Sequence, residues 1–227
     1  RASNILIQQS DCLIVVGSRL GLQQTGFAWK EFAPLAKIFQ VDVDESEIKK
    51  GHPRIYKGLV SDAYEFLEMF LNKFKPDQSK NICWLEFGRN VIAKFPLNDE
   101  QNETSSGYLD PYEFAEEISI LLNEKDVIIP CSSGGAFTVM MQAFKSKHGQ
   151  VIITNKGLAS MGYGLSAAIG AAESTQRRTI LVEGDGGFAQ NLQELGTLVQ
   201  RNLNLKIFLF SNKGYASIRM TQRNYFA

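Results

Sequence analysis

The sequence predicts an α/β fold with two doubly wound units, each built on a parallel sheet. Short apolar runs rich in Val and Ile recur along the 227-residue chain, and such runs are typical of strands buried on both faces. Segments with apolar residues at helical spacing separate these runs, and polar or glycine-rich turns follow several of them. This alternation predicts parallel strands joined by crossover helices.

The first predicted unit covers residues 1–75. Apolar runs at residues 12–16 and 37–41 predict two strands, which are followed by polar or glycine residues. Residues 61–74 place apolar side chains at helical spacing behind Ser61, a possible N-cap, and predict the helix that closes the unit.

A more polar segment follows at residues 76–108. It contains Pro76, Pro96 and the pair Ser105–Ser106 around one amphipathic patch near residues 84–92. This composition predicts a linker between the two units.

The second predicted unit covers residues 109–227 and begins with a helix signal. Asp110 can cap this helix, Pro111 suits its first position, and Glu113 has the spacing of a capping box. Apolar runs then alternate with helical patterns: strands are predicted at residues 127–129, 151–153, 179–182 and 205–210, and helices at 135–147, 158–172 and 191–201. Ligands of such sheets bind at the carboxyl ends of the strands, so the residues just after each run are the candidate site.

Composition and charge narrow the classes of partner. The 24 Lys and Arg residues balance 24 Asp and Glu residues, so no overall basic field favours nucleic acid or an anionic membrane surface. The apolar runs are far shorter than the roughly 20 residues that cross a bilayer, and residues 1–10 lack the apolar stretch of a secretory signal. We therefore expect no nucleic-acid partner, no membrane partner and a cytoplasmic location.

The chain has three cysteines, Cys12, Cys83 and Cys131. The number is odd and no CxxC pair occurs, which argues against a disulfide framework or a zinc site. We expect buried, reduced thiols.

The glycine-rich turn at residues 184–187 is the sharpest functional signal. Gly184, Gly186 and Gly187 let the backbone approach a phosphate, and the helix that follows offers free N–H groups. Asp185 would repel that phosphate unless a cation lies between them.

Further oxygen ligands for such a cation are expected one strand away. Asn212 follows the strand at residues 205–210, and Gly214, which lacks a side chain, can turn its carbonyl inward. Carboxylate, amide and carbonyl oxygens suit Mg²⁺. Asp185, Asn212 and the Gly214 carbonyl therefore predict a diphosphate-bound Mg²⁺.

An alternative interpretation stays open for the same turn. Gly184, Gly186 and Ala189 also satisfy the pattern of a dinucleotide-binding turn, which would make the chain an NAD-binding oxidoreductase. That arrangement expects a carboxylate at the end of the next strand, where this chain has Ser211 and Asn212. The metal-bound diphosphate is the favoured interpretation.

Gly184-Asp185-Gly186, with Asn212 and Gly214 downstream, resembles the cofactor motif of thiamine-diphosphate-dependent enzymes. Residues 159–164, Ala-Ser-Met-Gly-Tyr-Gly, followed by Ala-Ala-Ile-Gly, resemble the glycine-rich helix start of acetolactate synthase-type carboligases. Segments between residues 11 and 44 resemble the central domain of the same enzymes, so the likeness covers nearly the whole chain.

The resemblance implies a thiamine diphosphate cofactor held through Mg²⁺ by Asp185, Asn212 and the Gly214 carbonyl. Met161 corresponds to the bulky apolar residue that holds the cofactor in a bent form, and the Met161 N–H and Ala159 carbonyl would contact its pyrimidine edge. The implied cofactor-binding residues are therefore Ser133, Gly134, Ala159, Met161, Gly184, Asp185, Gly186, Gly187, Asn212 and Gly214. Ser133 and Gly134 would form a second phosphate loop.

The resemblance also implies a reaction: decarboxylation of a 2-oxo acid, with pyruvate the first choice, and transfer of the acyl anion to a second carbonyl compound or to a proton. The family's proton-relay glutamate lies on an N-terminal domain that this chain does not include, so no catalytic residue is assigned here. We expect the chain to be a piece of a larger polypeptide, to be inactive alone, and to form a homodimer or homotetramer in the whole protein. A non-catalytic member of the fold is the remaining alternative.

The chain departs from the synthases at several places. Ser132 and Ser133 stand where they have a Gln-His-rich loop, Ser211 replaces an Asn, and only Arg19 remains of the flavin-contacting segment, which argues against bound FAD.

Structural interpretations remain for several other residues. Glu183 and Glu194 are interpreted as structural rather than as general bases, and Met161 could instead be a core methionine. His52 and His148 are expected to be exposed.

Overall fold

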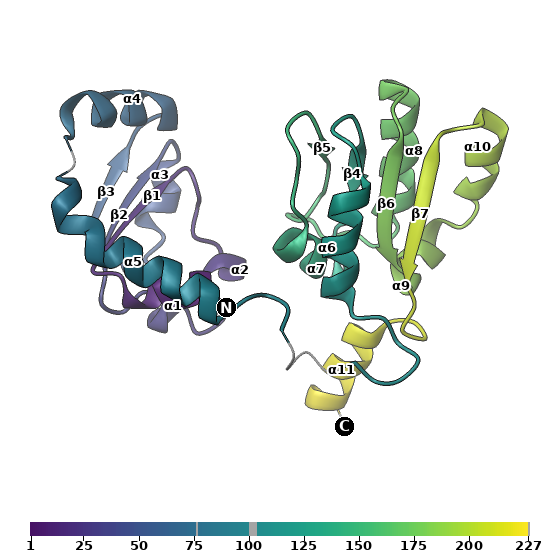
Figure 1. Cartoon of the computed structure of the whole chain (residues 1–227), viewed down its shortest axis with the longest axis horizontal. Helices are drawn as coiled ribbons and strands as arrows, with labels where there is room; N and C mark the ends of the chain where they lie inside the picture. Colours follow the sequence, from purple (N-terminus) through teal and green to yellow (C-terminus); the bar gives the residue numbers. More distant parts are fainter. Residues whose placement is uncertain (76, 100–103, 227) are drawn as a thin grey trace. The chain divides into compact units, whose positions relative to one another are not determined.

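A computed structural model describes residues 1–75, 77–99 and 104–226. The chain forms two compact units, Arg1–Pro96 and Leu97–Ala227, each with its own parallel sheet (Figure 1). The predicted α/β class is confirmed. No helix within the described ranges combines the length and apolar character needed to cross a membrane.

The first unit has a three-stranded sheet in the order β1 (Cys12–Val16), β2 (Lys37–Asp42), β3 (Lys57–Val60), with every pair parallel. Its helices are α1 (Ala2–Gln9), α2 (Leu22–Thr25), a 3-10 turn (Trp29–Glu31), α3 (Glu45–Lys49), α4 (Ala63–Lys73) and α5 (Gln78–Lys94). The core forms around Val15, Leu20, Ala33 and Ile38.

Several elements of this unit differ from the prediction, which named none of the helices α1, α2 and α3. β3 was not predicted, because its four residues include Gly58 and make only a short apolar pattern. The helix expected behind Ser61 begins at Ala63, and its cap is Asp62, whose carboxylate accepts from the N–H groups of Tyr64 and Glu65. An Asp carboxylate satisfies two free N–H groups of the first turn, which fixes the start of the helix.

The segment at residues 76–108, predicted as a linker, contains α5, a 17-residue helix that packs against α1. Asp77 caps this helix by accepting from the N–H of Ser79. The division between the two units falls after Pro96, inside the segment.

The expectation of buried thiols holds for one cysteine and is wrong for two. Cys131 is buried, whereas Cys12 and Cys83 are exposed. Cys12 is the first residue of β1, an edge strand of its sheet, and Cys83 lies on an exposed face of α5. A strand at the edge of a sheet has a neighbouring strand on one side only, so an apolar run there is not buried along its whole length.

The second unit has a four-stranded parallel sheet in the order β5 (Val151–Ile152), β4 (Val127–Ile129), β6 (Thr179–Gly184), β7 (Leu205–Phe210). Its helices are α6 (Pro111–Leu121), α7 (Gly134–Ala143), α8 (Tyr163–Thr175), α9 (Asp185–Phe188), a 3-10 turn (Ala189–Asn191), α10 (Glu194–Arg201) and α11 (Ala216–Tyr225). Asp110 caps α6 as predicted, accepting from the N–H groups of Tyr112 and Glu113.

Helices cover both faces of this sheet. Successive strand residues point to opposite faces, and Ile128, Ile180 and Val182 pack with α6 and α7, whereas Val127, Ile129 and Leu181 pack with α8. The predicted doubly wound arrangement is confirmed for this unit.

The strand order creates a switch point between β4 and β6. From β4 the chain adds β5 on one side and then crosses to add β6 on the other. The loops that leave β4 and β6 therefore run in opposite directions and open a crevice at the carboxyl ends of the two strands.

Residues 158–162 were expected to begin the helix now seen as α8, which starts only at Tyr163. Ala159 and Gly162 adopt positive φ angles of 53° and 82°, which an α-helix cannot contain. The segment before α8 is thereby left as a loop.

Candidate functional site

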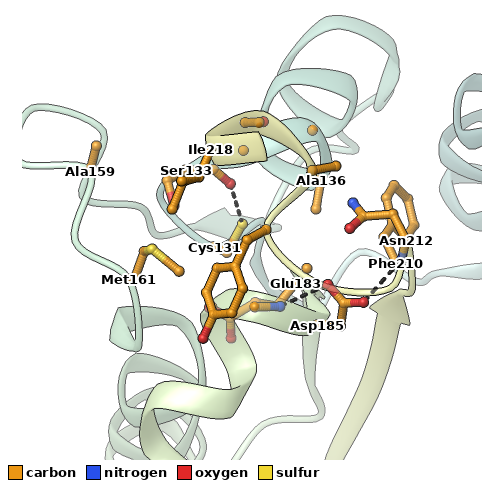
Figure 2. Close-up of a pocket in the computed structure, with 18 residues that line it drawn as sticks. Cys131, Ser133, Ala136, Ala159, Met161, Glu183, Asp185, Phe210, Asn212 and Ile218 are labelled. Atoms are coloured by element: carbon orange, nitrogen blue, oxygen red, sulfur yellow. Dashed lines mark hydrogen bonds between the residues drawn. The ribbon is translucent and has the colours of Figure 1, made fainter. Parts of the chain in front are cut away.

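A pocket of about 290 Å³ opens at the carboxyl edge of the second sheet. Its walls come from the loops after β4, β6 and β7, from the loop before α8 and from the start of α11 (Figure 2). Nine of the ten residues predicted to bind a cofactor line it: Ser133, Gly134, Ala159, Met161, Gly184, Asp185, Gly186, Gly187 and Asn212. The tenth, Gly214, is joined to the pocket through Asp185.

Asp185 connects the end of β6 to the loop after β7. Its Oδ2 accepts from the backbone N–H of Asn212 at 3.0 Å and from that of Gly214 at 2.9 Å. Its Oδ1 accepts from the N–H of Gly186 at 2.8 Å. Burial opposes ionisation of this carboxyl, but these hydrogen bonds outweigh that effect and lower the pKa of Asp185. The group is therefore a carboxylate at neutral pH.

The turn after β6 needs its glycines for space. A Cβ at Gly186 would lie 2.9 Å from Cδ1 of Tyr215, and one at Gly187 would lie 2.8 Å from Oε1 of Glu183. Side chains at these two positions would press on the pocket wall. The turn thus presents bare backbone to the pocket, as a phosphate-binding loop requires.

The loop after β4 forms the opposite wall. Ser133 is the N-cap residue of α7 without using its side chain as a cap, and Gly134 has a φ of 72°. Cys131 also adopts a positive φ, of 45°. A positive φ is ordinary for glycine but uncommon for cysteine, so Cys131 has the unusual backbone conformation of this loop.

Met161 lies beside this loop and not in the core. Its side chain is 40% exposed and lines the pocket. The hydroxyl of Ser132 donates to the Ser160 carbonyl at 2.6 Å and ties the Met161 loop to the loop after β4. The alternative of a core methionine is therefore wrong for this residue.

Nine further lining residues were not predicted as site residues: Cys131, Gly135, Ala136, Glu183, Phe210, Tyr215, Ala216, Ser217 and Ile218. Phe210 and Glu183 lie at the ends of predicted strands, a position that could have identified them. Tyr215, Ser217 and Ile218 belong to the start of α11, for which the sequence pattern gave no helix signal. Tyr215 also accepts a hydrogen bond from the Gln190 side chain at 2.9 Å.

Neither histidine is among the residues that line the pocket. His148 is exposed as expected, whereas His52 is half-buried, with its ring 5.3 Å from that of Trp29. The prediction of an exposed His52 is wrong, because the Trp29 ring packs beside it at a tilted angle.

The oxygen donors at the pocket suit a hard cation such as Mg²⁺. Asp185 supplies a carboxylate and Asn212 an amide from the adjacent loop, and these are ligand types that Mg²⁺ takes together with phosphate and water. Within residues 1–75, 77–99 and 104–226, no three His, Cys, Asp or Glu side chains gather as a metal-binding group. Two carboxyl groups, those of Asp185 and Glu183, are among the side chains that line the pocket.

Two family models match the chain. The model of the C-terminal TPP binding domain of thiamine pyrophosphate enzymes matches residues 133–227, and the model of their central domain matches residues 1–70. The chain belongs to the thiamine pyrophosphate enzyme family. The pocket of this family member lies within the part matched by the C-terminal model or just before it.

Curated relatives extend over the whole length of this family member. The acetolactate synthase large subunit of Porphyra purpurea is 30% identical over 230 residues, which are 99% of this chain and 38% of the relative. That of Cyanidium caldarium is 31% identical over 231 residues, again 99% and 38%. A probable acetolactate synthase large subunit of Methanocaldococcus jannaschii is 30% identical over 233 residues, 100% of this chain and 39% of the relative. The chain therefore spans less than two fifths of the length of these relatives.

Proposed function

We propose that the chain forms the diphosphate-binding part of a thiamine-diphosphate- and Mg²⁺-dependent carboligase. The reaction would be decarboxylation of a 2-oxo acid, pyruvate first among them, with transfer of the acyl anion to a second carbonyl compound, as the names of the acetolactate synthase relatives suggest. One observation supports it most: Asp185, Asn212 and Met161, far apart in the sequence, line one pocket at the switch point of the sheet.

The phosphate end of the cofactor would be held at the turn after β6. Asp185 and Asn212 would bind Mg²⁺ through their side-chain oxygens, and Gly214 through its carbonyl. The backbone N–H of Gly187 would donate to the diphosphate, and that of Gly186, which donates to Oδ1 of Asp185 in the structure, would be shared with it. The low pKa of Asp185 supports this assignment, because the carboxylate is ionised before any cation arrives.

The loop after β4 and the loop before α8 would hold the rest of the cofactor. Ser133 and Gly134 would contact the diphosphate from the opposite wall. Met161 would support the bent cofactor, while its N–H and the Ala159 carbonyl would contact the pyrimidine edge. The exposure of Met161 toward the pocket favours this role over packing in the core.

When bound, thiamine diphosphate supplies the electron sink that makes loss of carbon dioxide from a 2-oxo acid possible. The residues of this chain would bind and orient it and keep water from the reacting end. The proton-relay glutamate expected from the family resemblance is not among the residues assigned here. We further propose that the whole protein acts in the cytoplasm as a homodimer or homotetramer.

The proposal is tested by comparing ligands on the full-length protein. Thermal unfolding is measured with NAD, with thiamine diphosphate alone and with thiamine diphosphate plus Mg²⁺, followed by a pyruvate-consumption assay. Stabilisation by thiamine diphosphate that depends on Mg²⁺, together with consumption of pyruvate, is the expected result. Stabilisation by NAD alone would contradict the proposal, and cofactor binding without turnover of any 2-oxo acid would favour a non-catalytic member of the family.

A further inference from the structure

Glu183 has a buried carboxyl group that the proposed function does not use. It is the penultimate residue of β6, directly before the turn at residues 184–187. The residue is only 3% exposed yet lines the pocket. Buried carboxyl groups are rare because removal from water disfavours their charged form.

The carboxyl occupies a space left by two glycines on different segments. A Cβ at Gly164, in the first turn of α8, would lie 2.5 Å from Oε2 of Glu183. One at Gly187, in the turn after β6, would lie 2.8 Å from its Oε1. The Glu183 side chain therefore fits between the start of α8 and the diphosphate turn, and either segment would have to move if its glycine gained a side chain.

The contacts around the Glu183 carboxyl do not fully compensate the cost of removing it from water. Oε2 is buried without a hydrogen-bond partner. Burial raises the pKa of Glu183 to about 7, although the backbone N–H groups of Gly164 and Leu165 favour its charged form. A carboxyl that served stability alone would be expected to have partners for both oxygens. An apolar side chain of the same size would suit this position better on stability grounds.

The two segments that meet at Glu183 have different proposed roles. The loop before α8 contains Ala159 and Met161, assigned to the pyrimidine end of the cofactor, and the turn at residues 184–187 is assigned to its diphosphate end. Figure 2 shows Glu183 close to Asp185, with Met161 on the opposite side of the view. Whatever sets the separation of these segments also sets the length of the space between the two ends of the cofactor.

We propose that Glu183 is a positioning residue: its buried carboxyl, fitted between Gly164 and Gly187, holds the loop before α8 and the diphosphate turn at the separation that the bound cofactor needs. This inference rests on the proposed function. It assigns Glu183 no proton transfer and no contact with substrate. Its observable consequence is that cofactor affinity and stability respond to Glu183 in opposite directions.

The first test measures both quantities on the full-length protein. Calorimetry gives the Kd of thiamine diphosphate with Mg²⁺, and scanning calorimetry gives the Tm of the cofactor-free protein. Glu183→Met removes the buried polar group at similar volume, so we expect an equal or higher Tm with a Kd weakened about 10-fold or more, the size of effect that supporting residues of a site show. Glu183→Gln keeps the shape and the acceptor oxygen and is expected to bind within about threefold of wild type.

A second test uses the space around the carboxyl. Gly164→Ala alone is expected to weaken binding, because its methyl group displaces the Glu183 carboxyl, and to have no further effect in a Glu183→Ala background, where the space is free. Gly170→Ala is the matched control: it lies on the same helix, and no atom lies within 4 Å of its added Cβ. Alanine favours a helix at both positions, so helix propensity cannot cause a loss.

The results that overturn the inference are distinct from those that overturn the proposed function. If wild type binds thiamine diphosphate with Mg²⁺ and Glu183→Met binds it equally well, the positioning role is wrong and the proposed function stands. It is also wrong if Glu183→Met lowers Tm without changing Kd, or if Gly164→Ala weakens binding equally in both backgrounds. If wild type itself does not bind the cofactor, both proposals fail.

Discussion

The carboxylate of Asp185 accepts a hydrogen bond of 2.9 Å from the backbone N–H of Gly214, 29 residues further along the chain. The bond joins the turn after β6 to the loop after β7 and fixes the side of the pocket assigned to the metal. Since the same carboxylate is the proposed Mg²⁺ ligand, its substitution should affect binding more than folding.

Asp185→Asn in the full-length protein should weaken Mg²⁺-dependent binding of thiamine diphosphate by about 100-fold or more, because a direct ligand loses its charge. Calorimetry with and without Mg²⁺ measures the effect. Asp62→Asn, at the cap of α4 in the other unit, is the matched control and should leave the affinity unchanged. An unaltered Kd for Asp185→Asn would refute the metal assignment.

Gly186→Ala should weaken cofactor binding about 10-fold, since the added methyl group lies 2.9 Å from the Tyr215 ring and moving the wall costs roughly 1–3 kcal/mol. Gly196→Ala in α10 is the control, because nothing lies within 4 Å of its added Cβ. Titration of both variants with thiamine diphosphate and Mg²⁺ checks the difference. Equal cofactor affinities of the two variants would mean that the turn after β6 accommodates the added methyl group without weakening binding.

Met161→Ala should change the stability of the cofactor-free protein by less than about 1 kcal/mol, because its side chain is already 40% exposed. The same variant should lower kcat of the full-length protein on pyruvate, and Met161→Leu should restore most of it. Met140 is 2% exposed in the core, and Met140→Ala should cost about 2–5 kcal/mol of unfolding free energy. Urea unfolding measures the free energy of unfolding of both variants. A large decrease for Met161→Ala would mean that Met161 stabilises the core, which would contradict its assignment to the pocket.

Asp126 and Arg178 form an ion pair at the amino-terminal ends of β4 and β6, the edge of the second sheet opposite the pocket. Arg178 donates from Nε to Oδ1 of Asp126 at 2.8 Å and from Nη2 to Oδ2 at 2.6 Å. Burial opposes the charge on Asp126, but the hydrogen bonds from Arg178 and the Asn123 backbone outweigh it and lower the pKa of Asp126. A carboxyl with a lowered pKa binds fewer protons when folded than when unfolded, so its stabilisation is present above the unfolded pKa and is lost as pH falls through the folded pKa.

Asp126→Asn should therefore cost about 1–3 kcal/mol of unfolding free energy at pH 7 and progressively less toward pH 3. Denaturant unfolding of wild type and variant across this range measures the difference. Arg178→Lys, which keeps the charge but not the paired geometry, should lose an intermediate amount. A difference that stays constant with pH would contradict the ion-pair interpretation.

Local signals in the sequence were enough for much of the second unit. The apolar runs at residues 127–129, 179–182 and 205–210 are strands, and Asp110 caps its helix, because burial pattern and capping depend on residues close together in the chain. The same rules missed β3 and α11, whose patterns are short or polar. They also placed the start of α8 too early, because the composition of this segment does not reveal the positive φ of Ala159.

The sequence by itself determined the alternation of strands and helices and the glycine–aspartate turn after β6, because each depends on a few consecutive residues. Only the tertiary structure decided that Glu183 is buried between Gly164 and Gly187, that Cys12 is exposed, and that Met161 faces a pocket. These facts follow from the strand order β5-β4-β6-β7 and from which strands lie at an edge. Contacts between residues distant in sequence arise only when the whole sheet has assembled.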